Sequence, residues 1–165
     1  MSKAYAMTGW RCGWLAGPRE VIKAANALQS HETSNVNSIT QKAAIAALTG
    51  PQACVSEMLA IYKQRRDQVR AWLGDEPRLR AAVPQGAFYL FIDISDFLSP
   101  DGIRTSIEFA DQLLASEHVV TTAGEAFDTP GFLRLSYANS LENLREGTTR
   151  LIRFARAHAG AAARA

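Results

Sequence analysis

The sequence has little of several features that usually point to a compartment or a partner. Its 165 residues include only two cysteines, Cys12 and Cys54, and their wide spacing predicts free thiols in a reducing compartment. It shows neither a signal-peptide pattern nor an apolar run near the roughly 20 residues that span a bilayer. The net charge of +2 is too small to indicate binding to nucleic acid or to an anionic membrane. We therefore expect a cytoplasmic protein with neither of these partners.

Patterns for metal binding and for several common catalytic sites are also missing. The three histidines, His31, His118 and His158, have no metal-ligand spacing with either cysteine, so no metal site is predicted. No nucleophile elbow, P-loop or dinucleotide fingerprint occurs. The 47% of hydrophobic and 21% of charged residues are ordinary for a soluble globular protein of one domain or slightly more.

The first seventeen residues are the most informative stretch of the sequence. Lys3 stands eight positions before Arg11, with small and aromatic residues and no other charge between them. The run from Ser2 to Arg11, SKAYAMTGWR, resembles the cofactor-lysine segment of the fold type I pyridoxal-phosphate aminotransferases, closest to their aspartate aminotransferase branch. The resemblance implies that Lys3 bonds covalently to the aldehyde of pyridoxal 5'-phosphate and that Arg11 grips the cofactor phosphate.

Physical chemistry is compatible with these two roles. A lysine that bonds to an aldehyde must lose its proton near neutral pH, which requires a desolvated site or a nearby cation. A phosphate suits the forked guanidinium of arginine better than the single ammonium of lysine. The alternative is that Lys3 is a solvated lysine and Arg11 a surface charge. The ten-residue match favours the cofactor interpretation.

Apolar spacing predicts the elements of the N-terminal third. Residues 11–16 alternate in polarity, which favours a short strand. Pro18 suits the first turn of a helix, which we expect to end near residues 30–33. The polar run 33–35 suits the cap of a second helix, which ends at the break 49–51. In the resembled family a loop like 33–35 lies near the subunit interface, and a plain helix cap remains an equal alternative.

The rest of the sequence predicts a long helix followed by a small sheet with helices. We expect a helix at 52–73, a second one that starts near 103 and a third that starts near 139. Asn139 and Glu142 suggest a capping box at the start of the third helix. The expected strands are 79–83, 87–92, 119–122 and 132–137. The strand 87–92 is apolar on both faces, which suits a central strand covered on two sides. We expect the alanine-rich tail 157–165 either to continue the last helix or to fray.

The resemblance extends through this region and implies a fold. The family has a Gly-Ala-Phe-Tyr element where this chain has residues 86–89. The implied fold is α/β (α+β), the small domain of the fold type I pyridoxal-phosphate enzymes plus a remnant of their large domain. We expect residues 1–17 to be the large-domain remnant, 18–50 the connecting helices and 51–165 the small domain.

Arg134 is the third candidate site residue. On the strand 132–137 it shares a face with Phe132 and Ser136, and an arginine buried there without a partner would be very costly. The family's Arg-Leu-Ser-Tyr motif coincides with residues 134–137, and it implies that Arg134 clamps the α-carboxylate of the substrate with a two-pronged hydrogen bond. The alternative is a structural ion pair with a nearby Asp or Glu.

These features lead to an aminotransferase hypothesis and two alternatives. The resemblance implies transfer of an amino group from an amino acid, aspartate-like, to a 2-oxo acid, in a homodimer or other homo-oligomer. In the family some two hundred residues precede the cofactor lysine, so we expect this chain to be a fragment with little activity alone. One alternative is a non-catalytic relic that acts as an interaction module. Another is the aminotransferase-like half of a transcription regulator, which would need a DNA-binding segment before Met1.

The same comparison makes a prediction about exposed apolar surface. In the family, a large domain would cover Met7, Trp10 and Trp14, and each such side chain gains roughly 1.5–3 kcal/mol on burial. If exposed together, they favour self-association. We therefore expect residues 1–17 either to pack in another way or to lie in a homodimer contact.

Overall fold

The computed structural model describes residues 1–158, so most of the alanine-rich tail lies outside the described part. The chain divides into two compact units, Met1–Leu59 and Ala60 onward, and the division falls within the longest helix of the described residues. Each unit is described by itself below.

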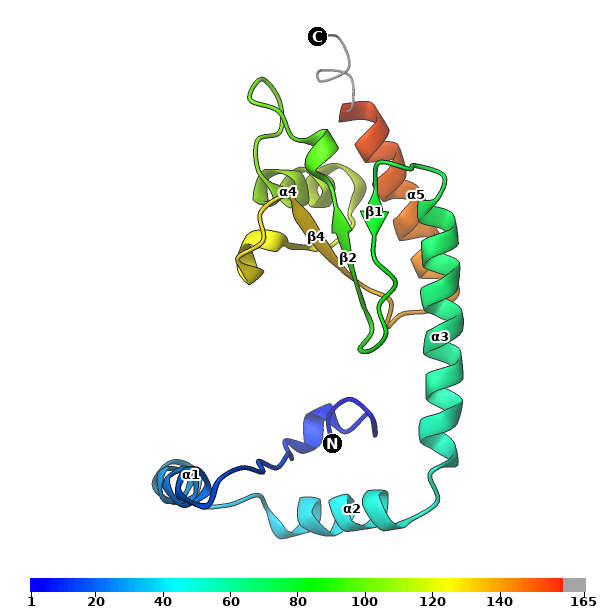
Figure 1. The fold of residues 1–165 in the computed structure, drawn as a ribbon. Helices are drawn as coiled ribbons and strands as arrows, with labels where there is room; N and C mark the ends of the chain where they lie inside the picture. The colour runs from blue at the N-terminus through cyan, green and yellow to red at the C-terminus, as the bar shows by residue number, and fades with distance from the viewer. Residues whose placement is uncertain (159–165) are drawn as a thin grey trace. The chain divides into compact units, whose positions relative to one another are not determined.

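The N-terminal unit contains helices and connecting turns (Figure 1). Its elements are the 3₁₀ helix η1 (Thr8–Trp10), α1 (Arg19–Glu32), α2 (Ser38–Thr49) and the first part of α3 (Ala53–Leu73). The three α-helices confirm the helices predicted in this stretch. Pro18 lies just before α1 as its N-cap residue, rather than in its first turn. The cap of α2 is Asn37, whose Oδ1 accepts a hydrogen bond from the Thr40 amide at 2.9 Å, so the cap predicted at residues 33–35 is wrong by two positions.

Residues 11–16 form no strand, and that prediction is wrong. Their side chains alternate in polarity, but a strand also needs a neighbour that satisfies its backbone N–H and C=O groups. Within the described residues, the only sheet consists of four strands that begin at Arg80. Alternation alone therefore could not make this segment a strand.

The C-terminal unit is built on an antiparallel sheet in the order β1-β2-β4-β3. The strands are β1 (Arg80–Ala81), β2 (Tyr89–Asp93), β3 (Thr122–Ala123) and β4 (Phe132–Ser136). The central position predicted for β2 is confirmed, and β4 ends one residue before the predicted 137. The predicted strand 79–83 shrinks to two residues, and the strand expected at 119–122 begins only at Thr122.

The two faces of this sheet differ in burial. Leu90 and Ile92 of β2 are fully buried, whereas Tyr89, Phe91 and Asp93 on the opposite face are only partly buried. The cover predicted for both sides of β2 is therefore complete on one face and only partial on the other. The partly buried face carries Arg134, which pairs in register with Phe91.

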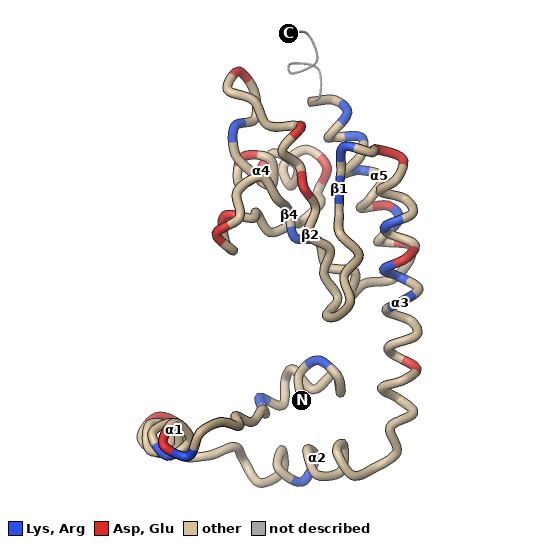
Figure 2. Tube along the Cα trace, viewed as in Figure 1, with Lys and Arg blue, Asp and Glu red and all other residues tan. Residues whose placement is uncertain are grey.

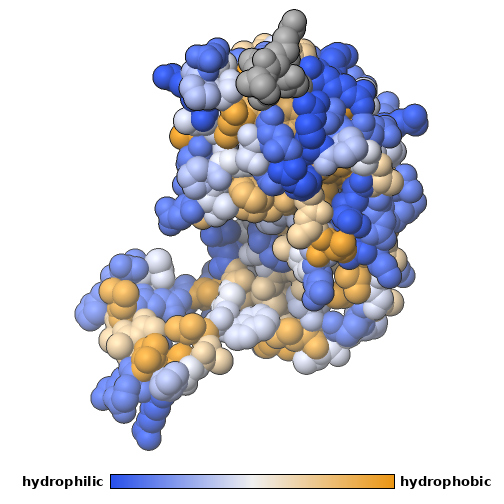
Figure 3. All heavy atoms as spheres, turned by 45° about the horizontal axis from the view of Figure 1, so that its top comes forward, coloured by the Kyte–Doolittle hydropathy of each residue, from blue (hydrophilic) through white to orange (hydrophobic). Residues whose placement is uncertain are grey.

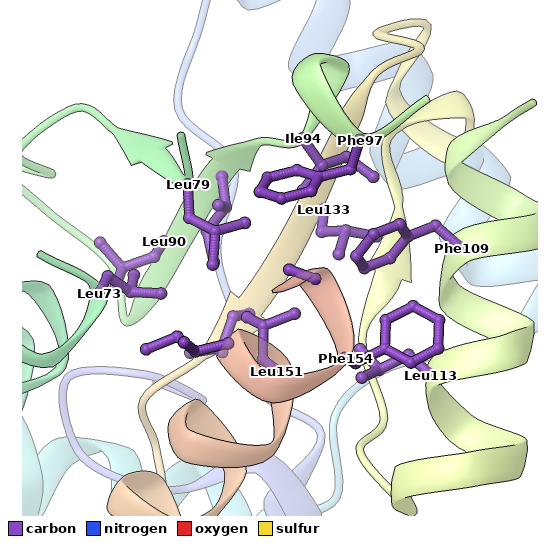
Figure 4. Close-up of a cluster of buried hydrophobic side chains, with 14 of the residues drawn as sticks. Leu73, Leu79, Leu90, Ile94, Phe97, Phe109, Leu113, Leu133, Leu151 and Phe154 are labelled. Carbon is purple, nitrogen blue, oxygen red and sulfur yellow. The ribbon is translucent and has the colours of Figure 1, made fainter. Parts of the chain in front are cut away.

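The buried face packs on α4 (Ser106–Glu117) and α5 (Leu141–His158) to form the core (Figure 4). The ring of Phe109 on α4 meets the ring of Phe154 on α5 edge-on, with centroids 4.9 Å apart. Leu90 on β2 and Leu133 on β4 belong to the same cluster, both with no exposed surface. Each of these side chains gains roughly 1.5–3 kcal/mol from burial, so this cluster is the main source of stability in the C-terminal unit.

Polar groups fix the starts of the two core helices. The hydroxyl of Thr105 accepts from the Glu108 amide at 3.1 Å, and the hydroxyl of Ser140 accepts from the Asn143 amide at 3.1 Å. The capping box predicted at Asn139 and Glu142 is therefore off by one residue. Such caps are worth roughly 1 kcal/mol each.

A buried carboxylate connects the C-terminal end of α5 to the turn after α3. Glu76 is 5% exposed and forms ion pairs with Arg78 at 2.8 Å and Arg156 at 3.2 Å. Hydrogen bonding from Arg78 is the main cause that lowers the pKa of the Glu76 carboxyl to about 2. Along α5 the acidic residues lie in the first half, while the second half carries Arg150, Arg153 and Arg156 (Figure 2).

No single helix among the described residues is both long and apolar enough to cross a membrane. Within residues 1–158, only α2 and α3 taken together meet that criterion of length and composition, as a pair bent by 79° at the break between them.

Candidate functional site

Arg134 lies in the middle of β4, on the partly buried face of the sheet. Its guanidinium carbon, Cζ, is 4.4 Å from the ring centroid of Tyr89 and 4.6 Å from that of Phe127, over both rings. Its Nη2 donates to the hydroxyl of Thr122 at 3.4 Å. Thr122 is the residue of β3 that pairs in register with Arg134.

Arg134 forms no ion pair with any residue of the described part, 1–158. The structural ion pair considered as an alternative is therefore not found there. One long hydrogen bond leaves most of its five N–H donors available, and a guanidinium with free donors suits two-pronged recognition of a carboxylate.

Tyr137 closes the motif that begins with Arg134, and it has a structural role. Its side chain is 2% exposed, and its hydroxyl donates to the backbone carbonyl of Ala87 at 3.0 Å. Burial is the main cause that raises the pKa of Tyr137 above its ordinary value, so the phenol stays protonated and keeps this hydrogen bond. The bond holds the end of β4 against the residues that lead into β2, which carries Tyr89.

Lys3 and Arg11 lie in one turn-rich segment of the N-terminal unit, and Thr8 connects their surroundings. The Thr8 hydroxyl donates to the carbonyl of Ser2, next to Lys3, at 2.9 Å. The Thr8 carbonyl accepts from Nη1 of Arg11 at 3.1 Å. The amide of Ala6 donates to the Lys3 carbonyl at 3.1 Å. This segment therefore gives the lysine and the arginine a defined backbone setting.

Arg11 borders a hollow of about 480 Å³ in the N-terminal unit, lined by Ala6, Gly9, Trp10, Arg11, Asn37 and Thr40. Asn37 and Thr40 belong to the start of α2, where a helix favours negative charge. The side chain of Asn37 and the amide and hydroxyl of Thr40 bond to each other, so the donor in this hollow that suits a phosphate is the guanidinium of Arg11. That group fits the phosphate of pyridoxal 5'-phosphate in its chemistry.

The three predicted site residues fall in different units. Lys3 and Arg11 share the N-terminal unit, and Arg134 belongs to the C-terminal unit. Within residues 1–158 no group of three His, Cys, Asp or Glu could hold a metal ion, and the free cysteines Cys12 and Cys54 match the thiols predicted from the sequence.

Sequence reasoning missed four residues around these side chains: Thr8, Tyr89, Thr122 and Phe127. Tyr89 and Thr122 could have been considered as neighbours of Arg134, because they come from strands that flank β4. Thr8 had only its place between the lysine and the arginine. Phe127 comes from the 3₁₀ helix η3 (Gly124–Phe127), and no periodic pattern of the sequence points to its contact with Arg134.

The three apolar side chains singled out among the first seventeen residues differ in exposure. Trp10 is 45% exposed and Trp14 68% exposed. Met7 is 8% exposed, so it is covered within this chain, as the first of the two expected alternatives allows. Hydrophobic side chains also lie on the visible surface of α1, where Val21 and Leu28 are exposed (Figure 3).

Comparison with known proteins adds independent findings. Residues 1–151 match the family model "Aminotransferase class I and II". The aspartate aminotransferase of Geobacillus stearothermophilus is 43% identical over 159 residues, which cover 96% of this chain and 40% of that protein. That of Rhizobium meliloti (strain 1021) is 44% identical over 156 residues, 92% of this chain and 38% of that protein. The chain thus spans about two-fifths of the length of these curated relatives.

Solved structures are similar over the same extent. The crystal structure of the aspartate aminotransferase from Rhizobium meliloti has a TM-score of 0.84 at 41% identity, and the match covers 94% of this chain and 40% of that one. The crystal structure of the aromatic aminotransferase from Pyrococcus horikoshii has a TM-score of 0.85 at 34% identity, with 94% of this chain and 41% of that one covered.

Proposed function

The chain belongs to the class I and II aminotransferases, and from that premise we propose that it is the cofactor-lysine and substrate-carboxylate part of an aspartate aminotransferase-like enzyme. The reaction is the transfer of an amino group from an amino acid to a 2-oxo acid. The α/β fold of helices around a small antiparallel sheet is that of a fold type I piece. Relatives named for aspartate and for aromatic substrates both match, so an aspartate-like substrate is the finer part of this proposal.

The cofactor we propose is pyridoxal 5'-phosphate, held by Lys3 and Arg11. When bound, it supplies an electron sink for the substrate α-carbon and carries the amino group. The amine of Lys3 would hold the cofactor covalently, and as a free amine it would move a proton at the α-carbon. Arg11 fixes the phosphate with charge-assisted hydrogen bonds. Thr8 supports the backbone next to Lys3 and the side chain of Arg11, because its hydroxyl donates to the Ser2 carbonyl and its carbonyl accepts from the Arg11 guanidinium.

Arg134 binds the α-carboxylate of the amino acid in this proposal. Its guanidinium, without an ion pair among residues 1–158 and with most N–H donors available, is the observation that carries the assignment. Holding the carboxylate fixes the orientation of the α-carbon and of the bond that reacts. Positioning of this kind can supply a large part of a catalytic effect.

The domain assignment and the assembly are also part of the proposal. We infer that residues 1–17 belong to the large domain, 18–50 to the connecting helices and 51–165 to the small domain. The exposed Trp10 and Trp14 favour a homo-oligomer, in which burial of apolar surface would stabilise the contact. Since residues 1–165 correspond to about two-fifths of their relatives, we expect this polypeptide tested alone to transfer amino groups slowly or not at all.

The covalent bond to Lys3 is the direct test. We expect incubation with pyridoxal 5'-phosphate, borohydride reduction and peptide mapping to place the modification on Lys3, and the absorption of the lysine-bound cofactor to be lost in Lys3→Ala. Lys23→Ala is the matched control, because Lys23 is an exposed lysine on α1 of the same unit. Equal labelling of Lys3 and Lys23 at every cofactor concentration would contradict a dedicated site.

A non-catalytic interaction module remains the second candidate, favoured by the exposed apolar residues of the N-terminal unit. The two candidates differ in a measurement of transamination between aspartate and 2-oxoglutarate. Activity that disappears in both Lys3→Ala and Arg134→Lys supports the enzyme. The measurement is repeated after addition of a polypeptide that corresponds to the other three-fifths of the relatives' length. If Lys3 is labelled selectively but no amino group is transferred even then, the result supports the interaction module.

A further inference from the structure

The surroundings of Arg134 are aromatic rather than acidic. The guanidinium lies over the rings of Tyr89 and Phe127, and no carboxylate among residues 1–158 pairs with it. The arginines of the sheet and its helices that have structural roles are arranged differently. Arg80 pairs with Asp93 and Asp96, and Arg156 pairs with Glu76.

This difference has a physical consequence for binding. A carboxylate beside Arg134 would hold the side chain in place, but it would also occupy the N–H donors and cancel the charge that a substrate needs. An aromatic face attracts the cation through its quadrupole and uses none of those donors. Two ring faces can therefore fix a guanidinium while its edge stays available.

Phe127 is 41% exposed, and contact with Phe91 supports its ring. Phe91, which pairs in register with Arg134, meets Phe127 edge-on with centroids 6.0 Å apart and stacks on Phe132 at 4.9 Å. At the start of η3, a Cβ on Gly124 would come within 2.0 Å of the Thr129 carbonyl oxygen, so the turn that presents Phe127 is closely packed. Tyr89 is fixed by its place in β2, and its ring contacts that of Phe88 at 4.6 Å.

We propose that Tyr89 and Phe127 are positioning residues, whose ring faces hold the Arg134 guanidinium without neutralising it, so that its free edge receives the carboxylate of the substrate. This inference rests on the proposed function, because it deepens the role of Arg134 there. Thr122 contributes less, since its hydrogen bond to Nη2 is long, at 3.4 Å.

The ring contacts can be tested by NMR on the chain with isotope-labelled arginine. Side-chain signals of Arg134, assigned by their loss in Arg134→Lys, should lie upfield of those of an exposed arginine because of the two ring currents. Phe127→Leu and Tyr89→Leu should each move these signals downfield, whereas Tyr89→Phe and Phe127→Tyr, which keep the rings, should not. The internal control is Arg78, whose Cζ lies 4.7 Å from the Phe97 centroid and whose signals should not change. Thermal unfolding of each variant shows that the fold is kept.

The positioning role is tested by titration with succinate, a dicarboxylate, followed through the same Arg134 signals. We expect the dissociation constant to rise roughly three- to thirtyfold in Phe127→Leu and in Tyr89→Leu, the range that a cation–π contact supports. Tyr89→Phe and Phe127→Tyr should bind as the unaltered chain does.

The outcomes separate this inference from the proposed function. If both leucine variants bind succinate normally while Arg134→Lys does not, the rings do not position Arg134 and the inference is overturned, but the carboxylate role stands. If succinate leaves the Arg134 signals of the unaltered chain unchanged, the carboxylate role fails and positioning for it fails too. The upfield shifts still decide, in that case, whether the rings hold the guanidinium.

Discussion

The two units of this chain differ sharply in how they bury their side chains. Among residues 1–59 only Met7 and Thr40 are buried, while large apolar residues such as Trp14, Leu28 and Ile39 are more than half exposed. The C-terminal unit instead surrounds one cluster of buried residues on β2, β4, α4 and α5. Burial of apolar surface is the dominant favourable term in folding, so the C-terminal unit contains the interactions that make a domain stable.

The buried core and the residues that we propose to hold the cofactor lie in different units. Lys3 and Arg11, which we propose to hold the cofactor, lie in the unit with almost no core among its described residues. Arg134 lies on a strand whose other face is the core. We infer that the small sheet folds by itself, whereas the lysine segment depends on further protein surface for its cover. Three substitution pairs test this comparison.

The largest effect is expected from a matched pair of aromatic truncations. Phe109 has no exposed surface and contacts Phe154 in the core, while Trp14 is 68% exposed. Phe109→Ala should lower the free energy of unfolding by about 3–5 kcal/mol, because it removes buried area and leaves a cavity. Trp14→Ala should change it by less than about 0.5 kcal/mol. Urea unfolding followed by circular dichroism measures both, and similar losses in the two variants would contradict the comparison.

A smaller effect is expected from the buried carboxylate of the C-terminal unit. Glu76→Gln should lower the free energy of unfolding at pH 7 by about 1.5–3 kcal/mol, the value of hydrogen bonds to a charged group. Glu57→Gln is the control, because Glu57 is an exposed acid on the N-terminal part of α3, and it should have almost no effect.

The pH dependence of stability tests the same carboxylate. The pKa of Glu76 is lowered from 4.5 to about 2 by its arginine partners, so its contribution is complete above the unfolded value of about 4.5. That contribution is lost as the pH falls from about 4.5 towards 2. The stabilities of the unaltered chain and of Glu76→Gln should therefore converge over this interval. A constant difference between them down to pH 2 would exclude the ion pairs as the cause.

The sequence predicted the long elements well because their patterns repeat. The helix at 53–73 and the strand at 132–136 each carry several turns or alternations of apolar residues, and both lie close to the predicted bounds. Residues 11–16 show the limit of this reasoning, since alternation says nothing about whether a partner strand exists. The caps at Asn37 and Ser140 show another limit, because neighbouring polar residues are equally good caps until the backbone geometry selects one.

In the candidate site, too, some residues were identified from the sequence and others were not. Lys3, Arg11 and Arg134 were found through a resemblance of short motifs, and their roles stay predictions. The aromatic setting of Arg134 could not be predicted, because Tyr89 and Phe127 lie 45 and 7 residues away along the chain and meet it only through the sheet and η3. Contacts of this kind depend on register and on loop conformation, which local spacing does not determine.

The smallest effect is expected from two caps of the same kind, one in each unit. Asn37 accepts from the Thr40 amide at the start of α2, and Ser140 accepts from the Asn143 amide at the start of α5. Replacement of either by alanine removes one capping hydrogen bond, worth about 0.5–2 kcal/mol.

Ser140→Ala should lower the free energy of global unfolding by about 1 kcal/mol, because α5 is part of the core and cannot open alone. Asn37→Ala should leave global unfolding unchanged and speed hydrogen exchange only in the first turns of α2, since that helix can open locally without disturbing the core. Equal losses of global stability in the two variants would mean that the units unfold together, and the N-terminal unit would then have to share the cooperative core of the C-terminal one.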